Sequence, residues 1–201
     1  MCIELLDIGE LLTISEVSSS TTFDNKDSYA ATNAIDGVAG NLHGSKAFVS
    51  KSEKHPWIQL KLREVRYISS ILVINRNEWG NRLRDVEVRV GFNELAPGID
   101  SGLTNLVEVE KNSHCSSYEG PGKDNERIVL QCERSIKGRF VSLHMTQEGI
   151  LNIGDIKIYG YIGNIICNNA RFIFSVCSTI INVTLNIPSA ILSRKRSIPW
   201  K

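Results

Sequence analysis

The feature that most constrains the fold of this 201-residue chain is the alternation of apolar and polar side chains in short segments. Residues 58–62 (IQLKL) and 86–90 (VEVRV) alternate with a period of two, which is typical of a strand that buries one face. Residues 68–74 form a more continuous β-branched run, as in a strand that is covered on both faces. The helical period is weak throughout, so an all-β fold is predicted.

Turn-forming residues separate these segments from one another. Glycine- or proline-containing stretches lie at 78–81 (EWGN), 96–102 (APGIDSG) and 119–123 (EGPGK). Further strands are expected at 127–132, 139–145 and 153–160. Many short strands with this punctuation indicate an antiparallel sandwich or barrel.

The charge of the chain is balanced, with 23 lysines and arginines against 22 acidic residues and a formal net charge of +1. Such a balance exerts no long-range attraction, so nucleic acid and anionic membranes are not expected partners. An enzyme needs a nucleophile with a base, paired carboxylates or an open metal site. No such spacing occurs, because the four histidines are scattered and there is no G-x-S-x-G motif or phosphate-binding glycine loop. A binding module is therefore expected, not an enzyme.

The composition changes from about residue 163. Residues 172–192 carry no charge and precede the basic residues 194–196, so this segment is a weak candidate for a membrane span with a cytoplasmic flank. Asn182, Asn186 and Pro188 make it a poor hydrophobic segment. The alternative is a loosely structured or mispredicted tail, and a membrane is a partner only if the span is real.

Five segments, in order along the chain, resemble the motifs of one family. They are residues 30–37 (AATNAIDG), 55–62 (HPWIQLKL), the block from Ile74-Asn75-Arg76 through Arg82-Leu83 to 86–91 (VEVRVG), 138–141 (GRFV) and 156–160 (IKIYG). The pattern resembles the fucolectins (F-type lectins), and discoidin and coagulation factor V/VIII C domains share parts of it. The resemblance implies a discoidin-like jelly-roll β-sandwich over residues 10–162, followed by an extra C-terminal tail over 163–201. It also implies calcium-dependent binding of glycans, fucosylated ones among them.

Members of this family bind fucose with one histidine and two arginines. Arginine suits this task because its planar fork donates two parallel hydrogen bonds and keeps its charge. Glu78 replaces the aspartate of the motif, and Trp79-Gly80 replaces a vicinal cysteine pair. Val49 falls where the histidine stands, so the fucose site is partly degraded. The expected sugar contacts are Arg76, Glu78, Trp79 and Arg82.

Two alternatives to a sugar site remain. Arg76 and Arg82 could be solvated loop residues with carboxylate partners, with Trp79 plugging the core. Alternatively, the domain could be a discoidin-type protein- or lipid-binding adhesion module without sugar binding. The direction of the Trp79 side chain distinguishes ligand binding from a role in the core, because sugar or lipid binding needs it to point outward beside the arginines.

The resemblance also implies a calcium ion beside the sugar loops. Calcium takes six to eight oxygen ligands, several of which can be carbonyls. Asn33 and Asp36 match the side-chain ligands, and Val38 and Ser45 fall where the following loop donates backbone oxygens. The Gly154 carbonyl and the Asp155 carboxylate stand where the family has a Cys-Glu pair. The alternative is that Asn33 and Asp36 make an Asx turn.

Five cysteines leave at least one that is free or paired outside the chain. The resemblance pairs Cys115 with Cys132 in a disulfide, against the alternative of two reduced buried thiols. It also implies a secreted, extracellular protein. A homo-oligomer is a candidate state. Residues 1–12 lack the basic leader of a signal peptide. A truncated gene model and a cytosolic protein both remain as explanations.

Overall fold

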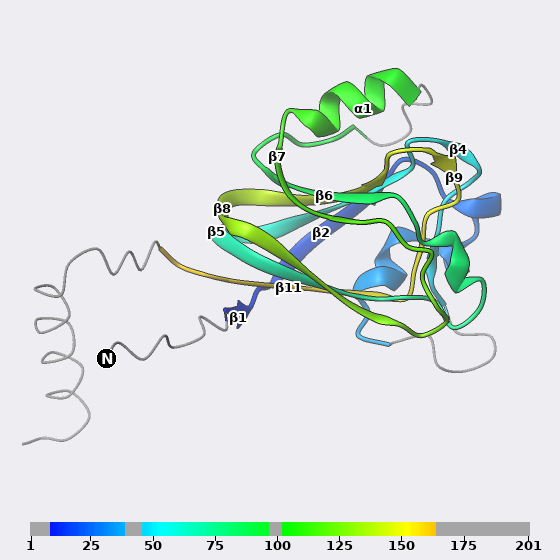
Figure 1. The fold of residues 1–201 in the computed structure, drawn as a ribbon, viewed down its shortest axis with the longest axis horizontal. Coiled ribbons are helices and arrows are strands. Elements are labelled where there is room, and N and C mark those ends of the chain that lie inside the picture. The colour runs from blue at the N-terminus through cyan, green and yellow to red at the C-terminus, as the bar shows by residue number, and fades with distance from the viewer. Residues whose placement is uncertain (1–8, 39–45, 97–101, 164–201) are drawn as a thin grey trace, which may run out of the picture. The chain divides into compact units, whose positions relative to one another are not determined.

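The computed structural model of the protein describes residues 9–38, 46–96 and 102–163, most of them in strands (Figure 1). The strands are β1 (Glu10–Leu11), β2 (Ile14–Ser19), β3 (Phe48–Val49), β4 (Glu53–Lys54), β5 (Trp57–Ile74), β6 (Val86–Gly91), β7 (Ser113–Tyr118), β8 (Arg127–Met145), β9 (Glu148–Gly149), β10 (Asn152–Ile153) and β11 (Asp155–Tyr161). The helices are the short 3-10 turns η1 (Phe23–Asn25), η2 (Asp27–Tyr29), η3 (Ala31–Ile35) and η4 (Gly80–Arg82), together with α1 (Gly102–Glu110). The predicted all-β class is confirmed.

The two longest strands, β5 and β8, organise the sandwich. They pair antiparallel from Trp57 opposite His144 to Ile74 opposite Arg127, and the register shifts twice between residues 61 and 70 of β5. A register shift of this kind bends a strand and increases its twist. Each strand therefore passes from one layer of the sandwich into the other.

The remaining strands complete the two layers. In the first layer β2 pairs with the N-terminal half of β5, and β6 joins the C-terminal half of β8 and then pairs with β7. In the second layer β11 pairs with the C-terminal half of β5, and β1 lies outside β11. Pairing is antiparallel throughout these ladders, as in the discoidin-like jelly-roll that was predicted.

The core fills the space between the layers, and the clearest alternation of buried and outward side chains occurs in β6. In β6, Val86, Val88 and Val90 are buried in the core, whereas Glu87 and Arg89 lie on the outer face of the first layer. The same alternation holds over residues 127–132 of β8, whereas residues 140–145 are buried without interruption. The buried apolar side chains between the layers form one continuous cluster. At about 25 cal/mol per Å² of buried apolar surface, this cluster is the main stabilising term.

The outer face of the first layer is itself partly covered. A second, smaller cluster joins Trp57 of β5 to Leu95 and to Val109 of α1, and α1 lies above this layer in Figure 1. His144 is the cross-strand neighbour of Trp57, and Glu87 is the neighbour of His144 on β6. This face therefore holds polar side chains that have little access to water.

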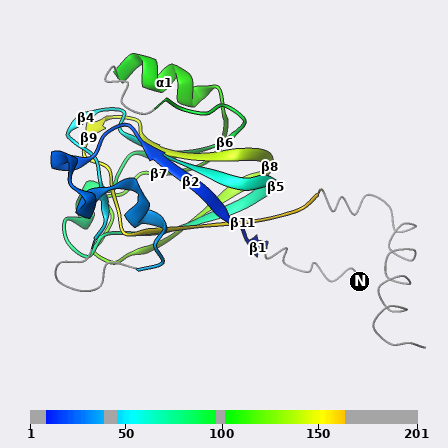
Figure 2. The ribbon, with the colours of Figure 1, turned by 180° about the vertical axis from the view of Figure 1, so that it is seen from behind.

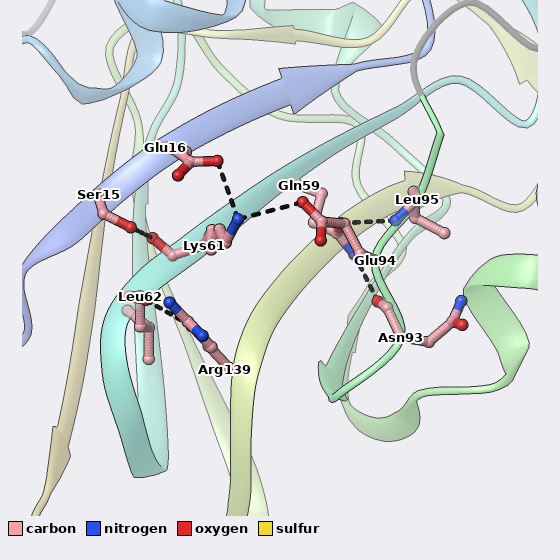
Figure 3. Close-up of polar contacts among 9 residues, drawn as sticks. All are labelled: Ser15, Glu16, Gln59, Lys61, Leu62, Asn93, Glu94, Leu95 and Arg139. Carbon is pink, nitrogen blue, oxygen red and sulfur yellow. Dashed lines mark hydrogen bonds and ion pairs between the residues drawn. The ribbon is translucent and has the colours of Figure 1, made fainter.

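Gln59 anchors the segment that leads toward α1 (Figure 3). Its Nε2 donates to the Asn93 carbonyl at 3.1 Å, and its Oε1 accepts from the Leu95 N–H at 2.8 Å. Beside it, Lys61 Nζ lies 3.0 Å from a Glu16 oxygen and 3.4 Å from a Glu94 oxygen. Both glutamates are solvent-exposed, so water and salt screen these pairs and they add little to stability.

Seen from behind, η1–η3 lie with β4 and β9 at one end of the sandwich (Figure 2). This loop end is where the candidate site lies. The tail predicted from residue 163 falls outside the described residues except for Gly163, and so does the candidate span at 172–192. In the described part of the chain no helix has the length and apolar character needed to cross a membrane.

Candidate functional site

The loop that follows β5, residues 75–85, carries all four predicted sugar contacts. Asn75 at its start is buried, and its side chain bonds in several directions. Nδ2 donates to the carbonyl oxygens of Gly80 and Lys123, both at 2.9 Å, while Oδ1 accepts from the Arg76 N–H at 2.8 Å. One amide side chain therefore fixes the turn and ties it to the neighbouring loop.

Trp79 points outward from this loop. Its side chain is 58% exposed, and its backbone is left-handed, with φ 62° and ψ 30°. The guanidinium carbon of Arg82 lies 4.7 Å from the centre of the indole, a cation–π contact. The alternative that Trp79 plugs the core is therefore wrong.

Arg76 also lies over an aromatic ring. Its guanidinium carbon is 5.7 Å from the ring centre of Tyr29 in η2, and Tyr29 contacts Phe23 of η1 edge-on at 5.4 Å. Arg76 Nε is buried and has no hydrogen-bond partner among residues 9–38, 46–96 and 102–163. Within the same residues, neither Arg76 nor Arg82 forms a salt bridge with a carboxylate. The site thus presents two guanidinium groups, each stacked on an aromatic side chain.

Val49, where the resemblance places the family histidine, does not lie at the surface. Val49 is only 2% exposed and lies in β3, opposite Asn152 of β10. Glu78, in contrast, is exposed on the same loop as Trp79. A ligand at this loop would meet Glu78 and the two arginines without a contribution from position 49.

A shallow groove of about 530 Å³ runs beside the loop end, between the end of β2 and the turns η1–η3. Hydroxyl and amide groups of Ser18, Ser20 and Asn25 contribute to its lining. Arg76, Trp79 and Arg82 do not line it, so the predicted sugar contacts belong to an exposed loop surface and not to this groove.

Two of the predicted calcium ligands, Asp36 and Asp155, come together from distant parts of the chain. Asp155 in β11 is 1% exposed, and its Oδ2 has no hydrogen-bond partner in the described part of the chain. Burial raises the pKa of Asp155, while Lys157 and the backbone N–H groups of Ile156 and Gly37 lower it. The carboxylate of Asp36 is close enough to raise this pKa further. Lys157 Nζ lies 3.9 Å from Asp155 Oδ2, an ion pair without a hydrogen bond. A buried carboxylate oxygen that accepts no hydrogen bond, beside a second carboxylate, suits a hard cation.

Three of the predicted calcium ligands, Asn33, Asp36 and Gly154, already form hydrogen bonds within the protein. The Asn33 amide donates to the Asp27 carbonyl at 2.8 Å, and Asp36 Oδ1 accepts from the Val38 N–H at 2.8 Å, which is the Asx turn given above as the alternative. The Gly154 N–H donates to the carbonyl of Ile74 at 2.9 Å. Ser45 lies outside the described residues. Among the residues that are described, no group of three or more His, Cys, Asp or Glu side chains could hold a metal.

The predicted disulfide between Cys115 and Cys132 is confirmed. Cys115 lies in β7 of the first layer and Cys132 in the half of β8 that belongs to the second layer, and both are buried. The bridge therefore joins the two layers of the sandwich.

Three residues of this site were not predicted from the sequence. Tyr29 directly precedes the AATNAIDG segment, so its place in the chain was a usable signal. Asn75 stands within the matched block, but nothing in the sequence marks it as a buried hydrogen-bonding centre. Asp124, which contacts the backbone of the Trp79 turn, comes from another loop and carries no motif.

Comparison with known families matches the model of a NedA-like, galactose-binding domain to residues 33–143, more than half of the chain. Fucolectin from Anguilla anguilla is 24% identical over 130 residues, which cover 64% of this chain and 75% of that protein.

Solved structures show the same fold. A fucolectin from the serum of Morone saxatilis (striped bass) has a TM-score of 0.57 at 23% identity, covering 77% of this chain and 50% of that chain. The present chain thus spans half the length of the striped bass lectin. A fucose binding module of Streptococcus pneumoniae has a TM-score of 0.55 at 15% identity, covering 75% of this chain and 96% of that chain. At these identities the likeness shows the fold alone.

Proposed function

This chain belongs to the family of NedA-like, galactose-binding domains, and on that basis we propose that it is a carbohydrate-binding module and not an enzyme. The observation that carries the proposal is the outward Trp79, with Arg82 stacked on its ring and Arg76 on the same loop. Lectins and glycan-binding modules among its relatives support the same function.

The chemistry of the loop suits a sugar. An exposed indole offers a flat apolar surface to the C–H face of a pyranose, at roughly 25 cal/mol per Å² buried. The two guanidinium groups can each donate two parallel hydrogen bonds to neighbouring hydroxyls. Apolar stacking combined with forked donors is a geometry that recognises saccharides.

Free fucose is expected to bind weakly. A charge-assisted hydrogen bond is worth about 1.5–3 kcal/mol, and a millimolar complex has only about 4 kcal/mol in total. The missing histidine contact at Val49 thus removes a large share of the affinity. Useful binding then requires a larger glycan or several copies of the domain acting together.

A glycan array probed with the full chain tests the proposal, with Arg76→Lys as the sharpest variant. Lysine keeps the charge but removes the fork, so binding is expected to fall at least about tenfold, in line with one lost charge-assisted bond. Arg84→Lys is the matched control, because Arg84 is an exposed arginine of the same loop whose Nε donates to the Asn81 carbonyl. Its binding should equal that of the wild type.

A wild type that binds no glycan on the array would contradict the carbohydrate proposal. Binding to lipid vesicles that disappears in Trp79→Ala would then support the alternative, a discoidin-type adhesion module that uses Trp79 as its apolar contact.

Calcium is proposed as the cofactor of this module. Asp155, Asp36 and the amide oxygen of Asn33 would hold the ion, together with carbonyl oxygens of Val38, Ser45 and Gly154. The buried Oδ2 of Asp155, which accepts no hydrogen bond within the described residues and has Lys157 Nζ 3.9 Å away, supports this assignment.

Calcium is expected to stabilise the fold against heat. A ligand that binds only the folded state contributes about 2.7 kcal/mol at a hundredfold excess over its Kd, or roughly 5–10 °C in a domain of this size. Thermal unfolding in millimolar calcium and in chelator measures the shift, and Asp36→Ala should abolish it. Asp24→Ala, at an exposed aspartate paired with Lys26, should keep it. Equal melting temperatures of the wild type with calcium and with chelator would remove calcium from the proposal.

An extracellular location is proposed for the protein. A structural disulfide persists in oxidising compartments, and a relative occurs in the serum of striped bass. Detection of the protein in culture medium of expressing cells, with the Cys115–Cys132 bridge formed, tests the location.

A further inference from the structure

The turn that presents Trp79 is held from a second loop, through Asp124. Asp124 Oδ1 accepts a hydrogen bond from the backbone N–H of Gly80 at 2.7 Å. The two loops touch here through their backbones, because a Cβ on Gly80 would lie 2.5 Å from the carbonyl carbon of Lys123. Glycine is therefore required at position 80, and the carboxylate of Asp124 reaches its N–H directly.

This bond acts on the backbone angle that aims Trp79. The N–H of Gly80 belongs to the peptide unit that turns with ψ of Trp79. The carbonyl of the same unit accepts from the Arg82 N–H at 3.0 Å, so both sides of the unit are fixed. Trp79 is held at φ 62°, a conformation that is unfavourable for a residue with a bulky side chain. Without Asp124 as the acceptor for the Gly80 N–H, Trp79 can return to an ordinary backbone conformation, which turns the indole away from Arg82.

Asp124 is itself presented by an anchored turn. Glu126 Oε2 accepts from the Lys123 N–H at 2.7 Å and from the Tyr118 hydroxyl at 3.1 Å. The Asn125 N–H donates to the Arg76 carbonyl at 3.0 Å. The turn is thus fastened to β7 on one side and to the loop 75–85 on the other.

We propose that Asp124 is a positioning residue for ligand binding, which holds the 58% exposed Trp79 outward with Arg82 against its ring. This inference rests on the proposed carbohydrate function. The ligand chemistry that fits the exposed part of the indole is a saccharide that sets an apolar C–H surface against it.

The test compares the wild type with Asp124→Ala, Asp124→Asn and Glu119→Ala in the full chain. Glu119 is an exposed acid of the same loop, so its removal changes the charge equally without touching the Gly80 N–H. The first readout is affinity for the glycan that binds the wild type most tightly on the array. If the outward state falls to about a tenth of the population, the apparent affinity falls about tenfold. Asparagine keeps an oxygen acceptor, so Asp124→Asn should recover part of the affinity, and Glu119→Ala should bind like the wild type.

The second readout does not depend on a ligand. NMR should show hydrogen-exchange protection of the Gly80 amide in the wild type and its loss in Asp124→Ala, with shifted resonances for Trp79 and Arg82. Unchanged Trp79 resonances in Asp124→Ala would overturn the inference even if the wild type binds no glycan. Equal affinities of Asp124→Ala and Glu119→Ala would also overturn it. If Asp124→Ala does not fold, Asp124→Leu, a branched side chain of similar size without an acceptor for the Gly80 N–H, carries the test, and wild-type affinity together with wild-type Trp79 and Arg82 resonances in that variant would be the contrary result.

Discussion

Acidification from above pH 6.5 to below pH 4 is expected to remove about 3 kcal/mol from the free energy of unfolding through His144 alone. His144 is 1% exposed, and its ring nitrogens have no hydrogen-bond partner within the described residues. Burial lowers its pKa to about 4. Glu87, 3.8 Å from Nε2, opposes this shift, but its carboxylate already accepts two hydrogen bonds from Arg89.

The direction of the effect follows from proton binding. Between pH 6.5 and about 4 the unfolded chain carries a proton on His144 and the folded chain does not. Lowering the pH therefore favours the unfolded state, and the contribution of the neutral imidazole is present above pH 6.5 and lost toward pH 4. Arg89, His55 and His114 also lie near enough to disfavour the charged form.

Urea unfolding at a series of pH values measures this loss, with His144→Gln as the variant that cannot titrate. The wild type should lose more stability than His144→Gln between pH 6.5 and 4, whatever the variant costs at neutral pH. His114→Gln is the matched control at an exposed histidine. It removes only the smallest of the effects that lower the pKa of His144, so most of the wild-type loss should remain. Parallel curves for the wild type and His144→Gln would contradict the prediction.

The strands could be predicted from the sequence because their signal is local. The alternation at 58–62 and 86–90 follows directly from the two faces of a strand. The same pattern does not show that 58–62 and 68–74 form one continuous strand, β5. That continuity depends on pairing with β8 across the register shifts, which only the folded chain determines.

Helix α1 shows how tertiary contacts override a local pattern. Residues 106–110 (LVEVE) alternate like a strand, yet they are helical. In a helix, Val107 and Val109 lie on nearly opposite sides, and accordingly Val107 is exposed while Val109 packs with Trp57 and Leu95. The contact with Trp57 is distant in sequence, so no local window contains it.

In the candidate site, too, some residues could be predicted from the local sequence and others depend on tertiary contacts. Arg76, Trp79 and Arg82 lie within one loop, so a motif could place them together. Tyr29 and Asp124 reach the same loop from other segments, and nothing in their local sequence marks those contacts. Burial of His144 also has no local signal, because it results from the covering of the outer face near Trp57.

Loss of the Cys115–Cys132 bridge is expected to lower the free energy of unfolding by about 3 kcal/mol. The two cysteines are 17 residues apart, and the chain-entropy model gives roughly that value for a closed loop of about this length. The open loop gains conformations mainly in the unfolded state. The bridge also joins β7 to the second-layer half of β8, so without it these strands are held by packing alone.

Denaturant unfolding of the wild type and of the double variant Cys115→Ala/Cys132→Ala, each with and without reductant, separates the bridge from the packing of the sulfur atoms. Under reducing conditions the two proteins differ only by the buried thiols, and that difference is the packing cost. Under oxidising conditions they differ by the packing cost plus the bridge, so subtraction isolates the bridge. Cys2, Cys167 and Cys177 are present in both proteins, and their effects cancel. A wild type whose stability is the same with and without reductant would show that the bridge contributes nothing, and the two layers would then be held together by their shared apolar core.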